Sequence, residues 1–409
     1  MTGACLAKYN HKIICVDINR EKVDMINNQK SPIYEKNLEE ILKEYKENIK
    51  ATTNYEEAIK NSEITFICVG TPSNNDGSIN LDYIKESAIE IAKQIKKLDR
   101  WHIVVVKSTV IPGTSEKFVK PLLEKYSGKK AGIDFGLAMN PEFLREGVAV
   151  DDFLHPDRIV IGALDEKSNE ILKKIYKDFS KPIIETNLSE AEMIKYASNC
   201  FLATKISFIN EIGTICKLIG IDTYKVADGM GYDKRICRAF LNSGIGWGGS
   251  CFPKDLLALK NYAEKNNIKP YIIENIIKRN DVQPLILIDL LKKHIPDIKN
   301  KTIGILGLSF KPNTDDIRYS RSIPIVKKLI KEGAKIIAYD PQAIDNFRKL
   351  YPDQITYCND SDEVLKSDAI LIITEWDEFK KLDYTGKIVI DGRRIKEAEK
   401  AKIYEGACW

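Results

Sequence analysis

The segment with the clearest chemical signature is a glycine-rich loop that ends in a cysteine and a lysine–aspartate pair. It reads Gly244-Ile-Gly-Trp-Gly-Gly-Ser-Cys-Phe-Pro-Lys-Asp255. Four glycines within six residues let a backbone approach a ligand closely. A thiol beside a lysine and near a helix start favours the thiolate, and Asp255 is placed to act as an N-cap or as a base near the sulfur. We therefore predict that Cys251 is a nucleophile; the alternative is a glycine-rich turn that ends in a buried cysteine.

A second segment, Asn140-Pro-Glu-Phe-Leu-Arg-Glu-Gly147, follows a predicted strand. Open α/β sheets bind their ligands at the carboxyl ends of strands. Gly70-Thr-Pro72 and Lys107-Ser-Thr-Val110 also follow predicted strands, so the three segments are expected to converge on one edge. Glu142 and Glu146 are its candidate functional carboxylates, and a solvated loop is the alternative interpretation.

Asp17 ends the first predicted strand and fits the acidic residue that binds the ribose of a dinucleotide. Such an acid lies about 20 residues after a glycine-rich phosphate loop, and no Gly-x-Gly-x-x-Gly occurs near the start of this sequence. The pattern therefore predicts that the first strand and the phosphate loop are missing, and that the sequence begins inside the first helix, 2–9. Alone, Asp17 is equally well explained as a cap or turn residue.

Short apolar runs alternate with helical stretches in residues 1–185, which predicts a parallel sheet covered on both faces. The expected strands are 12–17, 64–69, 103–107, 137–140 and 158–162, and 81–98 is expected to be a crossover helix. Residues 186–285 have almost no strand signal. They predict a helical domain with an N-cap at Ser189, a long helix over 193–219 and a further helix over 255–266. The long helix is expected to be a domain-spanning core helix or a dimer interface.

Residues 286–409 return to an α/β pattern. The strands expected there are 301–308, 335–340, 369–374 and 387–391, with a helix over 322–332. Lys12-Ile-Ile-Cys-Val-Asp17 matches Lys335-Ile-Ile-Ala-Tyr-Asp340, so the two α/β parts resemble each other. The predicted fold class is α/β, with two Rossmann-like parallel-sheet domains joined by a long central helical domain.

Composition excludes several classes of protein. The 409 residues are 44% hydrophobic with a formal charge of +4, which argues against disorder and against a dedicated nucleic-acid binder. No apolar run is long enough for a membrane span, and the N-terminus is not a secretory signal. Nine scattered cysteines without Cys-x-x-Cys, and four distant histidines, argue against disulfides and metal sites. We expect no metal, and a cytoplasmic location.

Together these motifs resemble the UDP-glucose 6-dehydrogenase family, within the larger UDP-glucose/GDP-mannose dehydrogenase group, from residue 2 to about 406. The resemblance rests on the order of these segments: 69–72, 108–109, 140–147, Lys195 with Asn199, 246–255, 310–311 and 391–394. The family's Gly-x-Gly-Tyr-Val-Gly loop is absent from the sequence.

The resemblance implies oxidation of a primary alcohol to a carboxylate with two NAD⁺, by way of a cysteine thiohemiacetal and thioester. It implies a site made of the following residues. The catalytic residues are Cys251, Lys195, Asn199, Asp255, Glu142 and Thr109. The NAD-binding residues are Asp17, Lys22, Thr71, Thr109 and Glu146. The UDP-glucose-binding residues are Phe143, Leu144, Lys195, Asn199, Arg235, Phe240, Gly248, Lys311 and Arg393. Arg235 resembles an arginine that reaches into the partner subunit's site, which implies at least a homodimer.

Three alternatives remain open at this point. Sister enzymes act on GDP-mannose or UDP-N-acetylmannosamine, and a 3-hydroxyacid dehydrogenase also combines a Rossmann domain with a helical domain and a helix lysine. The latter has no need of the Cys251 loop or of a second α/β half. The third is a chain that binds nucleotide sugars with impaired catalysis, because its phosphate loop is missing.

Overall fold

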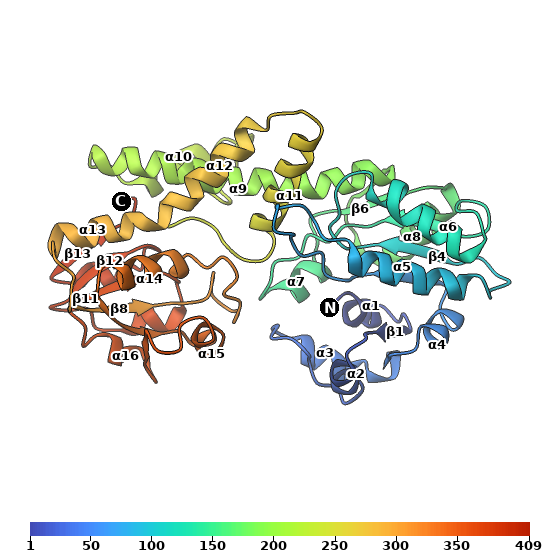
Figure 1. Ribbon diagram of the computed structural model, residues 1–409, viewed down its shortest axis with the longest axis horizontal. Helices are drawn as coiled ribbons and strands as arrows, with labels where there is room; N and C mark the ends of the chain where they lie inside the picture. The colour runs from blue at the N-terminus through green and yellow to red at the C-terminus, as the bar shows by residue number, and fades with distance from the viewer. The chain divides into compact units, whose positions relative to one another are not determined.

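The computed structural model of the protein describes every residue from 1 to 409. The chain forms two compact α/β units, Met1–Ser198 and Asn199–Trp409, which run from blue through green to red in Figure 1. No helix combines the length and the apolar character that crossing a membrane requires.

The larger sheet of the first unit has five strands in the order β3-β4-β5-β6-β7. Alternate residues of β4 point into two different cores, Val104 and Val106 into one, Ile103 and Val105 into the other. Helices therefore cover both faces of this sheet, as the apolar runs predict. The strands are β3 (Ile64–Ile67), β4 (Ile103–Val106), β5 (Gly136–Met139), β6 (Ile159–Ala163) and β7 (Ile183–Thr186). The helices are α5 (Asp82–Ile95), α6 (Lys120–Ser127), α7 (Ala149–Leu154) and α8 (Glu166–Ile175).

The remaining two strands of this unit form a separate sheet. There β1 (Ile13–Val16) pairs in parallel with β2 (Ile49–Thr52). The helices beside it are α1 (Thr2–Lys8), α2 (Arg20–Asn27), α3 (Leu38–Glu44) and α4 (Tyr55–Lys60), in blue in Figure 1.

The expectation of one purely parallel sheet is therefore wrong in two respects. The strands divide between two sheets, and β5 pairs with β6 in antiparallel fashion. An antiparallel neighbour needs no helical crossover of a dozen or more residues, and the connection between β5 and β6 contains only the six-residue α7. The strands β2 and β7 were not predicted.

The long helix α9 (Leu188–Leu218) begins in the first unit and ends in the second. Its start is a capping box: the Asn187 side chain accepts from the Glu190 amide at 2.9 Å, and Glu190 accepts from the Asn187 amide at 3.2 Å. Asn187, and not the predicted Ser189, therefore caps this helix. The helices that follow are α10 (Thr223–Gly231), α11 (Phe252–Lys265), α12 (Tyr271–Val282) and α13 (Ile286–His294).

The sheet of the second unit has six parallel strands in the order β10-β9-β8-β11-β12-β13. Residues of α13, α14 and α15 pack into one core with Ile336 and Ala338 of β9, and α16 packs into another with Ile337 and Tyr339 of the same strand, so helices cover both faces of this sheet. The strands are β8 (Thr302–Leu306), β9 (Lys335–Tyr339), β10 (Thr356–Tyr357), β11 (Ala369–Ile372), β12 (Ile388–Asp391) and β13 (Ile403–Gly406). The helices are α14 (Ser322–Lys331), α15 (Ile344–Arg348) and α16 (Ser361–Val364).

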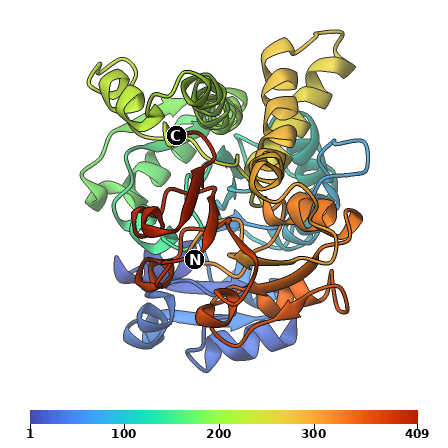
Figure 2. The same cartoon turned by 90° about the vertical axis from the view of Figure 1, so that its left-hand side faces the viewer.

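The end of the chain packs beside α10 in both views (Figures 1 and 2). The Arg394 guanidinium lies over the rings of Tyr224 and Trp409 and forms two hydrogen bonds of 2.5 Å with the Asp222 carboxylate. The Arg394 guanidinium holds the pKa of Asp222 down to about 2. This contact fixes the Asp391-Gly-Arg-Arg394 loop against the helical part of its own unit.

Candidate functional site

An ion pair joins α9 to the loop after β5. Lys195 Nζ lies 3.0 Å from Glu142 Oε1, and the two side chains are 4% and 26% exposed. Burial opposes ionisation of Glu142, but the Lys195 ammonium and the Leu144 amide outweigh it, so the pKa of Glu142 lies below its usual value. The pair therefore places a buried ammonium and an ionised carboxylate side by side.

Phe143 adds an aromatic face to this pair. The Arg158 guanidinium lies 3.9 Å from the centre of its ring and Lys195 Nζ lies 5.3 Å from it. Cations held over an aromatic face are attracted by the ring quadrupole. The predicted residues Glu142, Phe143, Leu144 and Lys195 are therefore brought together in the first unit.

Glu192 ties the same turn of α9 to the segment after β4. Its carboxylate is fully buried and accepts from the amides of Gly113 and Ser115, at 2.5 and 2.8 Å. Those amides start the short π-helix Ser115–Val119, whose free N–H groups favour a carboxylate. Burial raises the pKa of Glu192. The contact fixes Lys195, three residues later, relative to the Thr109 segment.

Thr71 and Thr109 also meet, since the buried Thr71 hydroxyl donates to the Thr109 carbonyl at 2.9 Å. The loops after β3 and β4 are thus held together at the carboxyl ends of their strands, as predicted. Glu146 is half-buried in the same loop as Glu142. Glu35 accepts from the amides of Gly147 and Ala149 at 2.8 Å each, which fixes the far end of that loop.

Asp17 follows β1 and is half-buried; its Oδ1 accepts only from the Asn19 amide within the same turn. Its other oxygen is well suited to a ribose hydroxyl, so this part of the structure fits a dinucleotide. Its counterpart Asp340 is different. It is 1% exposed, and one of its oxygens accepts from the amides of Leu308 and Ser309, the Ser309 hydroxyl and Trp376 Nε1. Asp340 is therefore a structural carboxylate, and the second α/β half does not repeat the ribose-binding acid.

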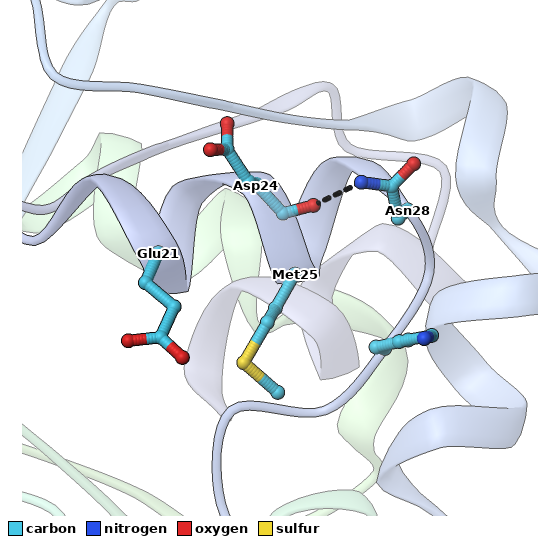
Figure 3. A pocket seen from close by; sticks show the side chains of 5 residues that line it. Glu21, Asp24, Met25 and Asn28 are labelled. Carbon is cyan, nitrogen blue, oxygen red and sulfur yellow. Dashed lines mark hydrogen bonds between the residues drawn. The ribbon is translucent and has the colours of Figure 1, made fainter.

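A shallow hollow runs along α2 (Figure 3). It is lined by Glu21, Asp24, Met25, Asn28 and Lys30. The Asn28 amide donates to the Asp24 carbonyl at 2.8 Å and closes the end of the helix. Lys22 is exposed on the same helix but does not line this hollow, and neither does Asp17.

In the second unit, the Cys251 loop is fixed by its own chain. A Cβ on Gly248 would lie 2.3 Å from the Tyr319 carbonyl oxygen, and Gly249, at φ +84°, donates its amide to the Arg318 carbonyl at 2.8 Å. The glycines therefore permit close packing against the 310–319 segment; their close approach to a ligand stays a prediction. Asn280 accepts from the Trp247 amide at 2.8 Å and donates to its carbonyl at 3.0 Å.

Cys251 itself is exposed and is the N-cap of α11; its sulfur lies 3.6 Å from the Ser250 hydroxyl. Asp255 is therefore not the N-cap but lies one turn into the helix, at 1% exposure. It accepts from the Asn199 side chain and from Lys254 Nζ, at 2.6 Å each. The structure thus brings the predicted Asn199 and Asp255 together, and Asn199 follows Lys195 by one turn of α9.

The other predicted substrate residues are spread over the second unit. Arg235 is 90% exposed at its side chain and pairs with Asp233 at 2.6 Å, and Phe240 packs at 6.5 Å from the ring of Phe252. Lys311 Nζ lies 5.5 Å from the centre of the Phe310 ring. Arg393 is half-buried, with Nε donating to the Ile373 carbonyl at 2.7 Å. No group of three or more His, Cys, Asp or Glu side chains in the chain is arranged to hold a metal ion.

Sequence reasoning missed Lys107, Tyr176 and Glu192. Lys107 had a signal, since it is a charged residue directly after the four-residue apolar strand β4, and it is only 6% exposed. Glu192 and Tyr176 had none, because their partners are contributed by segments far away in the sequence.

Comparison with known proteins defines the class. The models of the UDP-glucose/GDP-mannose dehydrogenase family match three segments: the NAD binding domain at residues 1–180, the central domain at 189–282 and the UDP binding domain at 304–398. The chain belongs to this family.

Several relatives resemble the chain over nearly its whole length. It is 43% identical to UDP-glucose 6-dehydrogenase AglM of Haloferax volcanii, over 98% of this chain and 96% of that protein. A UDP-glucose dehydrogenase structure from Pyrobaculum islandicum is 41% identical, with a TM-score of 0.96 over 100% of this chain and 94% of the other. A GDP-mannose dehydrogenase from Pseudomonas aeruginosa is 36% identical, with a TM-score of 0.57, over 100% and 97% of the two chains.

These comparisons do not support the predicted loss of the first strand and phosphate loop. The NAD binding domain model matches from residue 1 onward. The sequence lacks Gly-x-Gly-x-x-Gly, but that absence alone does not show that a strand and a loop of the domain are missing.

The contact between Glu192 and the two amides is open to a direct test. Glu192→Ala leaves two buried N–H groups without acceptors, so we expect a loss of about 2–5 kcal/mol in the free energy of unfolding. Glu116→Ala, at an exposed position of the same π-helix, is the control and should change it by less than about 0.5 kcal/mol. Denaturant titration measures both; equal, small losses would show that the Glu192 contact does not anchor α9.

Proposed function

We propose that the chain oxidises the C6 alcohol of UDP-glucose to a carboxylate, forming UDP-glucuronate. NAD⁺, when bound, accepts the hydride in each of the two oxidations. The observation that carries the proposal is an exposed cysteine at the start of α11, followed four residues later by the buried Asp255, whose carboxylate accepts from the Asn199 side chain. A single alcohol-to-aldehyde oxidation has no use for that nucleophile.

In the proposed mechanism Cys251 adds to the aldehyde carbon formed by the first oxidation. The C–S bond forms, the carbonyl oxygen takes the negative charge, and loss of the second hydride from this tetrahedral adduct gives a thioester. Water then displaces the thiolate and releases the carboxylate. The Lys195 ammonium and the Asn199 amide are the groups proposed to stabilise the oxyanion. Asp255 and Glu142 are proposed to order or activate the water, together with Thr109.

We assign the remaining predicted residues to binding. Asp17 suits the adenosine ribose, with Lys22, Thr71, Thr109 and Glu146 completing the NAD site. Phe143, Leu144, Phe240 and Gly248 are proposed to contact the sugar nucleotide. Lys311 and Arg393 are proposed to bind the UDP portion, since charge-assisted hydrogen bonds suit a diphosphate. Functionally, residues 1–185 then form the NAD half, 186–285 the helical middle and 286–409 the UDP-sugar half.

The substrate class is supported by the relatives. The chain is more similar to the UDP-glucose dehydrogenases, at 43% and 41% identity, than to the GDP-mannose enzyme, at 36%. GDP-mannose and UDP-N-acetylmannosamine are the competing substrates. None of the nine cysteines forms a disulfide, which is compatible with a role in the reducing cytoplasm, where nucleotide sugars for polysaccharide synthesis are made.

A homodimer is proposed on the exposed face of α9. Phe201, Phe208 and Ile215 recur every seven residues and are 64%, 49% and 51% exposed, and Leu218 is 85% exposed. A sustained apolar stripe on an exposed helix is typical of a subunit interface. Arg235, exposed in the same unit, is the residue proposed to reach the partner's site.

The function is tested by counting NADH released per UDP-glucose consumed, with NAD⁺ in excess. We expect two NADH for the unchanged chain and no more than one for Cys251→Ala, because the aldehyde cannot become tetrahedral at sulfur. Cys237→Ala, at another exposed cysteine, should still give two. GDP-mannose and UDP-N-acetylmannosamine in the same assay should be oxidised far more slowly; a faster rate with either would transfer the proposal to that substrate.

The dimer is tested by light scattering on the purified chain. Phe208→Glu places a charge in the apolar stripe and should give monomers at micromolar concentration. Leu350→Glu, at a similarly exposed leucine outside the stripe, is the control and should remain dimeric. A monomeric unchanged chain, or a dimer that survives Phe208→Glu, would contradict the assignment of this interface.

A further inference from the structure

A lysine with no assigned role lies inside the first unit at the carboxyl end of β4. Lys107 is 6% exposed, and its Nζ donates to Asn140 Oδ1 at 2.9 Å and to the Asn140 carbonyl at 3.3 Å. No carboxylate lies within ion-pair distance of it. A buried ammonium with only neutral acceptors is costly to maintain, and such groups concentrate at functional sites.

Asn140 joins this lysine to the loop that carries Glu142. Its side chain also accepts from the Tyr176 hydroxyl at 2.5 Å and donates to the Val160 carbonyl at 2.8 Å, while its backbone amide donates to the Val106 carbonyl at 2.9 Å. Both the oxygen and the nitrogen of the Asn140 side chain therefore have partners. Only Pro141 separates Asn140 from Glu142, so this network also fixes the position of the Glu142 backbone.

The charges in this region act on one another. Lys107 favours the ionised form of Glu142, and Lys195 opposes the charged form of Lys107. The other titratable groups that face Lys107 are the exposed Cys68, after β3, and the buried Tyr176, after α8; burial raises the pKa of Tyr176. From α7, the Phe153 ring lies 6.0 Å from Nζ. The region thus contains two ammonium groups and one ionised carboxylate.

We propose that Lys107 is a positioning residue for the reaction: it fixes Glu142 through Asn140 and adds a second positive charge near the Lys195–Glu142 pair. This rests on the proposed function, since it assigns a role in the same site. Lys107 touches neither reacting atoms nor Lys195; it acts through Asn140 and through its charge.

The role has a pH dependence whose direction follows from burial. Burial lowers the pKa of Lys107 to about 8, with the charge of Lys195 adding to the effect. Above that pH Lys107 becomes neutral, so its charge-assisted hydrogen bonds to Asn140 weaken and the region loses one of its two positive charges, while Glu142 stays ionised because its pKa lies below the usual value. We therefore expect an inflection near pH 8 in kcat for NADH release that belongs to Lys107.

The test compares Lys107→Met, Lys107→Arg and Tyr176→Phe with the unchanged chain between pH 6 and 10. Lys107→Met removes the charge and should lower kcat roughly 10- to 100-fold, leave the KM for UDP-glucose within about threefold and abolish the inflection. Lys107→Arg keeps a permanent charge, so its inflection should also vanish, with more activity retained at high pH. Tyr176→Phe removes a partner of Asn140 but no charge, and should keep the inflection even where kcat falls.

Thermal unfolding provides a readout that does not need activity. In the unfolded chain a lysine has a pKa of about 10.4. Between pH 8 and 10 the unfolded state therefore binds more protons at this position than the folded state does. The group therefore adds stability as pH rises. The Tm of the unchanged chain minus that of Lys107→Met should grow over this range by several degrees.

The outcomes separate the two proposals. An inflection that persists in Lys107→Met, or one that Tyr176→Phe also removes, would show that the charge of Lys107 does not affect kcat, and would overturn the inference. A constant Tm difference across pH 8–10 would overturn it as well. Failure of the unchanged chain to release NADH would contradict the proposed function instead, while the Tm comparison would still decide whether Lys107 is a buried titrating charge.

Discussion

The first unit depends on one buried ion pair, that between Lys195 and Glu142. An ammonium that is 4% exposed is costly to hold without a counter-ion, and the loop after β5 supplies the Glu142 carboxylate at 3.0 Å. Breaking such a pair leaves an uncompensated charge, so the helix and the loop must keep their relative positions. Glu192, one turn earlier in α9, adds a second anchor by accepting from the amides of Gly113 and Ser115. The segments after β4 and β5 are therefore both held by the same few residues of α9.

The second unit holds Cys251, the proposed nucleophile, by different means. Cys251 is exposed, and the backbone around it is fixed by close packing and neutral hydrogen bonds, with Gly248 against the Tyr319 carbonyl and Trp247 against Asn280. Beneath it Asp255 is buried and satisfied by Asn199 and Lys254. A rigid frame with an accessible sulfur is what a nucleophile requires. A side chain at Gly248 would displace the loop because its obstacle is backbone.

Much of this was accessible from the sequence, for identifiable reasons. Buried strands such as β4 and β8 are continuous apolar runs, and they were predicted to within one or two residues. The strands β2 (IKAT) and β7 (IIET) mix polar and apolar residues, so their pairing is decided by neighbours that the sequence does not reveal. The strand β6 was predicted, but its antiparallel pairing with β5 was not, because a connection that contains a short helix resembles a parallel crossover. Asn187 and Ser189 are both residue types that suit an N-cap, so residue type alone does not distinguish the observed cap from the predicted one.

Site residues divide in the same way. Cys251, Glu142, Lys195 and Asp255 follow from motifs whose order the family shares. Lys107 was visible only as a charge after a strand, since its burial and its contact with Asn140 are tertiary facts. The sequence repeats Asp17 at Asp340, but the two carboxylates differ in chemistry. Six donors already bond the Asp340 carboxylate, four at one oxygen and two at the other.

The ion pair is tested most directly by a double-mutant cycle on Glu142→Gln and Lys195→Met, measured as the free energy of unfolding at pH 7. Each single change should lower it by about 2–4 kcal/mol, because each leaves a buried charge unpaired, and the double change should lower it by clearly less than the sum. Losses that add to within about 0.5 kcal/mol would show that the two charges do not depend on each other, and would contradict the role assigned to the pair.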